Sequence, residues 1–288
     1  MKHPLTAKYV AILLGLLVVD VAVGQQLPPR QDVSREQLEH AYAEHDSDMR
    51  HTLPPYSGPP LLLDLSQVPF ESGMCDPTQH VAWENRFNGI MGEPVIADKG
   101  VHGPDYITMT SLTTIDTFEP IYSLPAKGAS DIVIAKAVAG RVCIPQTHRY
   151  VYTKFTLDVV KDFRKNDDQQ KNRQITAVQF GGSILFPSGF LETYLLDREG
   201  FPEIGKEYVL FMWKPIPADD TLVISQAYLI QDGFVFPICK GGGGYTVYTK
   251  MPFAEFEEKV RVAALANDNL DVFSDRSRKK DWTLDSQS

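Results

Sequence analysis

Two segments of the sequence share the pattern Cys-x-Pro-x-x-His, and both end residues are types that can bind a metal. The segments are residues 75–80 and 143–148. If they met in space, two thiolates and two imidazoles would complete a tetrahedral zinc site. The C-x4-H spacing departs from that of zinc fingers, however, and an oxidising compartment would join the thiols instead. We therefore prefer a Cys75–Cys143 disulfide or a chance repeat, and keep a zinc site formed by Cys75, His80, Cys143 and His148 as the alternative.

Nucleophilic catalysis has little support in the sequence. No Gly-x-Ser-x-Gly motif occurs, and Ser188 lies in a Pro-Ser-Gly-Phe segment typical of a hairpin turn. Cys143 and His148 could form a thiolate pair, but no Asn or Asp is identifiable as the group that orients the histidine. The sequence thus favours a protein without catalytic activity and without a cofactor. A metal-dependent hydrolase that uses the Cys and His clusters is the alternative.

A third cysteine, Cys239, leaves the disulfide pairing open. Three thiols allow one disulfide with one cysteine left over, and spacing alone does not say which two pair.

A ligand-binding surface is the second kind of chemistry that the sequence suggests. Tyr150, Tyr152 and Lys154 alternate along one predicted strand, so their side chains would share its polar face. Tyrosine is equally a good strand residue without any binding role. After the predicted strands comes a run of four glycines, which indicates a hinge or a ligand-facing loop. The run consists of Gly241, Gly242, Gly243 and Gly244. The lysine of this run precedes the glycines, which argues against a phosphate-binding loop.

These residues must be positioned by β-structure, and residues 150–163 are its clearest element. Five residues of the segment would share one face of a strand, namely Val151, Thr153, Phe155, Leu157 and Val159. A period of two over this length, rich in Val, Thr, Tyr and Phe, is typical of a strand with one buried face.

Further strand patterns fill the chain from residue 130 to residue 238. They span residues 131–139, 175–180, 184–186, 190–196, 207–213, 221–230 and 234–238. Residues 184–196 together predict a hairpin, and residues 207–213 are apolar on both faces, as in a strand covered on both sides. Short strands separated by turn residues favour a closed or nearly closed antiparallel barrel over a parallel α/β sheet. We therefore predict a mainly β fold.

The other segments surround this barrel. The predicted organisation is an exposed helix with a proline-rich linker at 25–60, an elaboration that packs on the barrel at 61–125, the barrel at 126–251, an amphipathic helix at 252–266 and a flexible tail at 267–288. A separate small domain at 61–125 is an alternative. The helix carries an apolar stripe of Phe253, Phe256 and Val260, which we expect to pack across the barrel.

Residues 1–24 have the pattern of an export signal. Lys2 and Lys8 give a positive start, an apolar stretch follows, and small residues precede a cleavage site before Gln25. An uncleaved anchor is the alternative, but the apolar stretch is shorter than the roughly 20 residues of a spanning helix, and Asp20 interrupts it. We therefore expect a mature chain without a stable membrane span, in the periplasm or outside a bacterial cell.

The sequence is acidic, with 28 Lys and Arg against 37 Asp and Glu and a formal charge of −9. Cleavage after residue 24 would remove two lysines and one aspartate, which changes the charge to −10. This balance, without a basic stripe, argues against nucleic acid and anionic lipid as partners. What remains is a non-catalytic exported module that binds a protein, a glycan or a small ligand through one barrel face and the glycine run.

Strand motifs carry a family resemblance. The segment Ser130-Asp131-Ile132-Val133-Ile134, then residues 152–160, Gly181-Gly182 and residues 205–211 follow one another as in a group of uncharacterised exported bacterial proteins. The same order is similar, more distantly, to the netrin-like β-barrel of tissue inhibitors of metalloproteinases, an OB-type fold. The resemblance covers about 110 residues and implies a fold, not an activity. Those inhibitors insert an N-terminal cysteine into a protease's zinc site, whereas the first cysteine here is Cys75, so no functional residue carries over.

Overall fold

The structure is a computed structural model that describes residues 53–75, 96–98, 110–115, 124–146, 148, 150–165, 173–196, 199–214, 221–239 and 247–266. The predicted export signal, most of the segment 25–60 and the predicted tail at 267–288 lie outside these residues.

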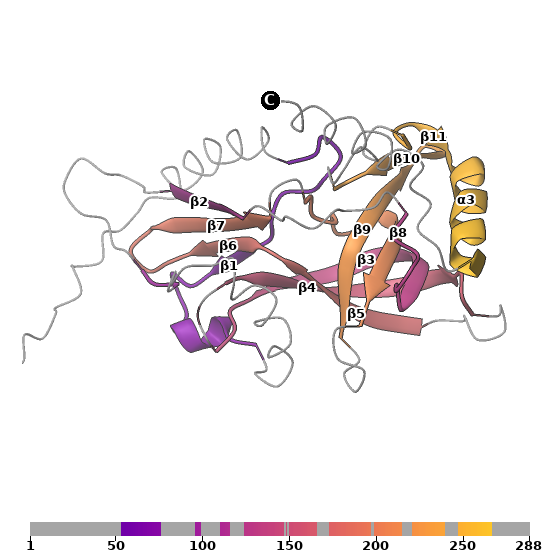
Figure 1. The fold of residues 1–288 in the computed structure, drawn as a ribbon. Helices are drawn as coiled ribbons and strands as arrows, with labels where there is room; N and C mark the ends of the chain where they lie inside the picture. The colour runs from indigo at the N-terminus through magenta and orange to yellow at the C-terminus, as the bar shows by residue number, and fades with distance from the viewer. Residues whose placement is uncertain are drawn as a thin grey trace, which may run out of the picture. The chain divides into compact units, whose positions relative to one another are not determined.

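Five strands form a closed barrel (Figure 1). They are β3 (Asp131–Cys143), β4 (Tyr152–Asp162), β5 (Arg173–Phe180), β8 (Glu207–Trp213) and β9 (Leu222–Gln231). Their order is β3-β4-β5-β9-β8, and β8 pairs with β3 to close the barrel. The predicted mainly β fold with a closed barrel is confirmed. The barrel is mixed rather than wholly antiparallel, because β5 and β9 run parallel while the other four pairings are antiparallel.

Alternation along β4 separates the barrel interior from its outer face. Phe155, Leu157 and Val159 belong to the interior core, whereas Asp158 and Val160 are exposed. A strand with one face in the core and the other toward solvent has this period of two. The pattern predicted for this segment is therefore present in the second half of β4.

The C-terminal helix α3 (Phe253–Ala266) covers an outer face of the barrel. Phe256 and Val260 are fully buried, and the Phe256 ring centroid lies 4.6 Å from that of Tyr228 on β9. Val209 and Phe211 of β8 join the same core, while Tyr208 and Leu210 fill the barrel interior, so β8 is covered on both faces as predicted. The predicted C-terminal helix is confirmed.

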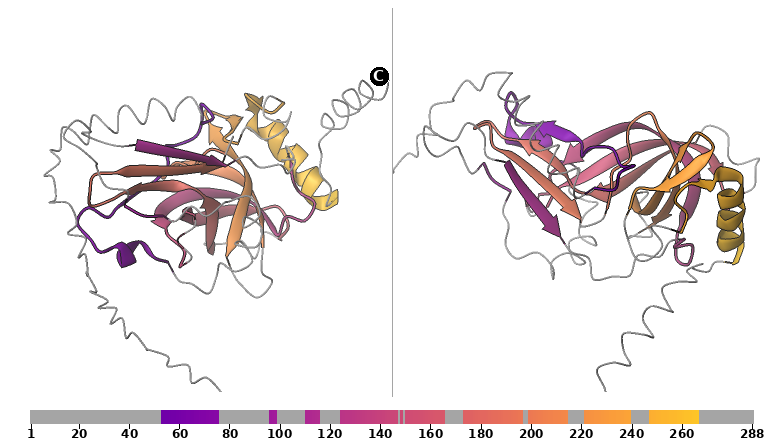
Figure 2. Two further views of the ribbon diagram at one scale, coloured as in Figure 1. Left: turned by 60° about the vertical axis from the view of Figure 1, so that its left-hand side comes forward. Right: turned by 90° about the horizontal axis from the view of Figure 1, so that it is seen from above.

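Two short strands connect the barrel to this helix. β10 (Phe234–Pro237) pairs with β9, and β11 (Met251–Pro252) pairs with β10 and leads directly into α3. Figure 2 shows the helix, in yellow, beside the orange strands β9 and β10 from two further directions.

A second sheet of four strands has the order β1-β6-β7-β2. Its strands are β1 (Leu62–Asp64), β6 (Gly182–Leu185), β7 (Leu191–Leu196) and β2 (Thr110–Ile115). The predicted hairpin is present as β6 and β7, but it lies in this sheet rather than among the barrel strands, because β1 and β2 pair with it in parallel. The irregular region before the barrel thus supplies both outer strands, and a short 3-10 helix, η1 (Phe70–Gly73), follows β1.

Candidate ligand-binding site

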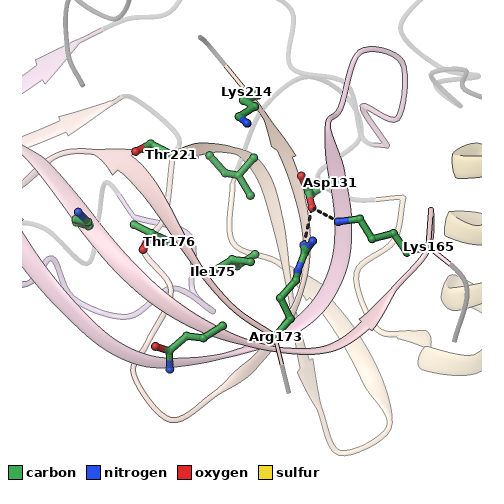
Figure 3. A pocket seen from close by; sticks show the side chains of 10 residues that line it. Asp131, Lys165, Arg173, Ile175, Thr176, Lys214 and Thr221 are labelled. Carbon is green, nitrogen blue, oxygen red and sulfur yellow. Dashed lines mark hydrogen bonds and ion pairs between the residues drawn. The ribbon is translucent and has the colours of Figure 1, made fainter. Parts of the chain in front are cut away.

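A pocket of about 500 Å³ opens where β5 and β9 part at one end of the barrel (Figure 3). All of β5 pairs with β4, but in the described residues β9 joins β5 only through Ala177↔Leu222 and Val178↔Val223. Residues 173–176 therefore run past the start of β9, and they line the pocket. The opening is a direct result of strand register.

The described lining comes from every barrel strand or its end. In chain order it consists of Asp131, Lys154, Lys165, residues 173–176, Lys214, Thr221 and Leu222. Figure 3 shows Thr176 and Thr221 on one side of the pocket and the charged Asp131, Arg173 and Lys165 on the other. The pocket is thus bordered by hydroxyl groups opposite an ion-pair cluster.

This ion-pair cluster contains two carboxylates and two cations. Arg173 Nη2 donates to Asp131 Oδ1 at 2.6 Å, and Lys165 Nζ lies 3.5 Å from the same oxygen. Asp162, whose side chain is only 3% exposed, lies 3.3 Å from Lys165 and 3.5 Å from Arg173. The four side chains join the start of β3, the end of β4 and the start of β5, so they fix the rim of the pocket.

Two further cations, Lys154 and Lys214, line the pocket outside this cluster. Lys154 is half-buried on β4, and within the part of the chain that the structure describes it has neither an ion-pair nor a hydrogen-bond partner. The position of Lys214 is set by its backbone N–H, which donates to Ser130 Oγ at 2.8 Å. Among the described lining residues, four cations stand against one carboxylate, which favours anions in the pocket.

The predicted aromatic binding face is part of the protein core. Tyr150 and Tyr152 are each 2% exposed, and the Tyr150 ring lies 6.0 Å from Phe180 and 6.3 Å from Tyr152. Both tyrosines belong to the core that holds the second sheet against β4 and β5. Lys154, on the same face of β4, is the member of the predicted set that lines the pocket. The glycines 241–244 lie outside the described residues.

The paired Cys-x-Pro-x-x-His segments meet through a disulfide. Cys75 and Cys143 are bonded, with Cα atoms 5.4 Å apart, so in this form neither sulfur is available as a thiolate ligand or nucleophile. His148 packs edge-on against Phe70 at 5.0 Å, and His80 lies outside the described residues. No group of three His, Cys, Asp or Glu side chains placed to hold a metal occurs in the segments described.

Cys239 is the remaining cysteine, and it is buried without a disulfide. Burial raises the pKa of its thiol to about 12. A thiol held neutral in this way is a poor nucleophile.

The comparisons with known proteins give no relative. No protein-family model matches the chain, and searches of curated proteins and of solved structures found no match. Among the described helices, none is both long and apolar enough to cross a membrane.

Most of the pocket was not predictable from local sequence. Lys154 was identified from the alternation on its strand, but Asp131, Arg173 and Lys214 come from separate strands that only barrel closure brings together. A pairing over 42 residues, such as Asp131 with Arg173, leaves no periodic signal in the chain.

Proposed function

We propose that this protein is an exported, non-catalytic binding module that holds a glycan or small ligand in the pocket between β5 and β9. The observation that carries the proposal is the pocket itself. Its volume of about 500 Å³ falls within the range of small-molecule sites, and polar groups from separate strands converge on it.

The barrel topology supports an OB-type relationship for this site. In OB-type barrels, the face of the second and third strands and the loop between the fourth and fifth bind oligosaccharides or oligonucleotides. Here β4 and β5 are the second and third barrel strands, and they contribute Lys154 and Thr176. Lys214 and Thr221 flank the connection between β8 and β9, the fourth and fifth. The acidic chain disfavours an oligonucleotide, so we assign the glycan or small-ligand alternative.

The disulfide supports an exported protein. Disulfides persist in the periplasm and outside the cell, whereas cytosolic thiols are kept reduced. The Cys75–Cys143 bond also argues against the alternative of a metal-dependent hydrolase, because that site would need both sulfurs as thiolates.

The proposal is tested by filling the pocket. Thr176 lies on β5 at the pocket, so a Thr176→Trp substitution should occupy the space, whereas Val262→Trp on the exposed face of α3 should not. A library of glycans and small metabolites is screened against residues 25–288 by thermal shift. We expect ligands that stabilise the unchanged protein and the Val262→Trp variant but not the Thr176→Trp variant. Ligands that stabilise all three proteins equally would place binding elsewhere and reject the proposal.

A further inference from the structure

The charge in this pocket is opposite in sign to that of the protein as a whole. The chain has a formal charge of −9, yet the described lining carries four cationic side chains and one carboxylate. Concave sites lined by one sign of charge concentrate ligands of the opposite sign. The excess of positive charge in the pocket of an acidic protein therefore indicates an anionic ligand.

The cations of the pocket divide into two groups. Arg173 and Lys165 lie within 3.5 Å of the carboxylates of Asp131 and Asp162, so this cluster is electrically balanced. Lys154 and Lys214 line the pocket outside it, and no described acidic side chain pairs with Lys154 on β4. The residue is half-buried at the pocket wall, and a cation beside a low-dielectric wall gains more from an anionic partner than one fully surrounded by water does.

Hydroxyl groups lie next to this lysine. In the register of β4 and β5, Lys154 is opposite Val178 and Thr156 is opposite Thr176, so Lys154 and Thr176 are diagonal neighbours on one face. Diagonal neighbours on paired strands are within reach of a long side chain. An ammonium and a hydroxyl together offer donors to one compact anionic group.

The opposite side of the pocket suits a neutral, hydroxylated part of the ligand. Asp131 and Arg173 occupy that side in Figure 3 and place a carboxylate acceptor beside guanidinium donors. Sugar hydroxyls both donate and accept, and such paired groups can satisfy them.

We propose that the pocket binds an acidic sugar, with its carboxylate or phosphate on Lys154 and Thr176 and its hydroxyls toward Asp131 and Arg173. This assignment rests on the proposed function and specifies the ligand class of the same site.

The test uses sugars that differ mainly in charge. Titration calorimetry on residues 25–288 gives Kd values for glucuronate, glucose 6-phosphate, glucose and glucosamine. We expect both acidic sugars to bind at least about tenfold more tightly than glucose, and glucosamine to bind most weakly. The tighter of the two acidic sugars then identifies the anionic group as a carboxylate or a phosphate.

Matched lysine variants test whether Lys154 causes the preference for acidic sugars. Lys154→Met should remove the tenfold preference, equal to about 1.4 kcal/mol, and Lys154→Gln should do the same because it also removes the positive charge. Lys206→Met removes the same charge from the exposed turn before β8, at the opposite end of that strand from Lys214, and should leave every Kd unchanged. Raising the salt concentration should weaken acidic-sugar binding in the unchanged protein more than in Lys154→Met.

Three results would overturn the assignment. One is equal affinity for glucose and the acidic sugars. The second is binding of the acidic sugars that Lys154→Met leaves unaltered, and the third is no binding of the acidic sugars at 10 mM. If the screen still yields a neutral ligand sensitive to Thr176→Trp, only the acidic-sugar assignment fails. If no ligand is sensitive to that substitution, the proposed function fails with it.

Discussion

The Cys75–Cys143 disulfide should make a large contribution to stability, because it fastens the segment after η1 to the end of β3. The Cys75 N–H donates to the Ile144 carbonyl at 3.3 Å, and the Ile144 N–H donates to the Gly73 carbonyl at 2.9 Å. The Cys143 side chain is fully buried. Loss of the bond would therefore release a segment that the native fold holds in register with the barrel.

The size of the effect follows from the length of chain that the bond closes. The two cysteines are 68 residues apart in sequence. Closing a loop of that length removes about 15 cal/mol/K of entropy from the unfolded chain, or about 4 kcal/mol at 25 °C. This is a large part of the roughly 5–15 kcal/mol by which domains are stable.

Urea unfolding of residues 25–288 measures this contribution. The Cys75→Ala/Cys143→Ala variant should lose about 4 kcal/mol of unfolding free energy, and adding a reductant to the unchanged protein should cause a similar loss without altering any side chain. Unfolding without reductant should expose a single titratable thiol, that of Cys239. A loss below about 1 kcal/mol, together with three titratable thiols, would refute this reasoning.

Three further predictions follow from burial. Phe256→Ala should lower the unfolding free energy by about 3–5 kcal/mol in urea, whereas Val262→Ala on the exposed face of α3 should change it by less than about 0.5 kcal/mol; similar losses would contradict the packing of α3. Since burial raises the pKa of Cys239 from 9.0 to about 12, the unfolded chain releases this proton first as the pH rises above 9. Stability should therefore fall by up to about 1.4 kcal/mol per pH unit from pH 9 to 10, and Cys239→Ala should lack that part of the slope; equal slopes would show that the thiol titrates in the folded state. Tyr152→Ala should cost about 3–5 kcal/mol of stability yet leave the Kd of a pocket ligand unchanged; a tenfold weaker Kd would place Tyr152 in the site.

The sequence predicts those parts of the fold that depend on local pattern. The alternation of Phe155, Leu157 and Val159 and the stripe of Phe256 and Val260 both correspond to buried faces in the structure. In each case a single strand or helix buries one face in one core, so the periodicity of its apolar residues is enough to predict the buried face.

Other features depend on which part of the protein packs over a strand, and the local sequence pattern of the strand does not reveal this. Tyr150 and Tyr152 lie on the polar face of the β4 pattern, but the second sheet covers that face and buries them beside Phe180. The hairpin of β6 and β7 is likewise predictable as a hairpin, while its place in the second sheet follows from parallel pairing with β1 and β2.

In the candidate site, too, one part is predictable from local sequence and the rest depends on how the strands pair. Lys154 could be singled out from its strand, whereas the pocket arises because β5 and β9 pair in parallel over two residue pairs. Parallel strands joined over a long stretch of chain leave no signal in a sequence window, so neither the opening nor the cluster of Asp131, Lys165 and Arg173 was predictable.

Binding between β5 and β9 is tested most directly by mapping a bound sugar onto the backbone. Amide resonances of residues 25–288 are followed by two-dimensional NMR during titration with glucuronate, with glucose as the neutral reference. The largest shifts should fall on residues 173–176, Lys154, Thr221 and Leu222, and in Lys154→Met the titration with glucuronate should become as weak as that with glucose. Shifts centred on α3 or on the second sheet would contradict a ligand site at this opening of the barrel. No shifts around the pocket with glucuronate would contradict the acidic-sugar assignment of that site.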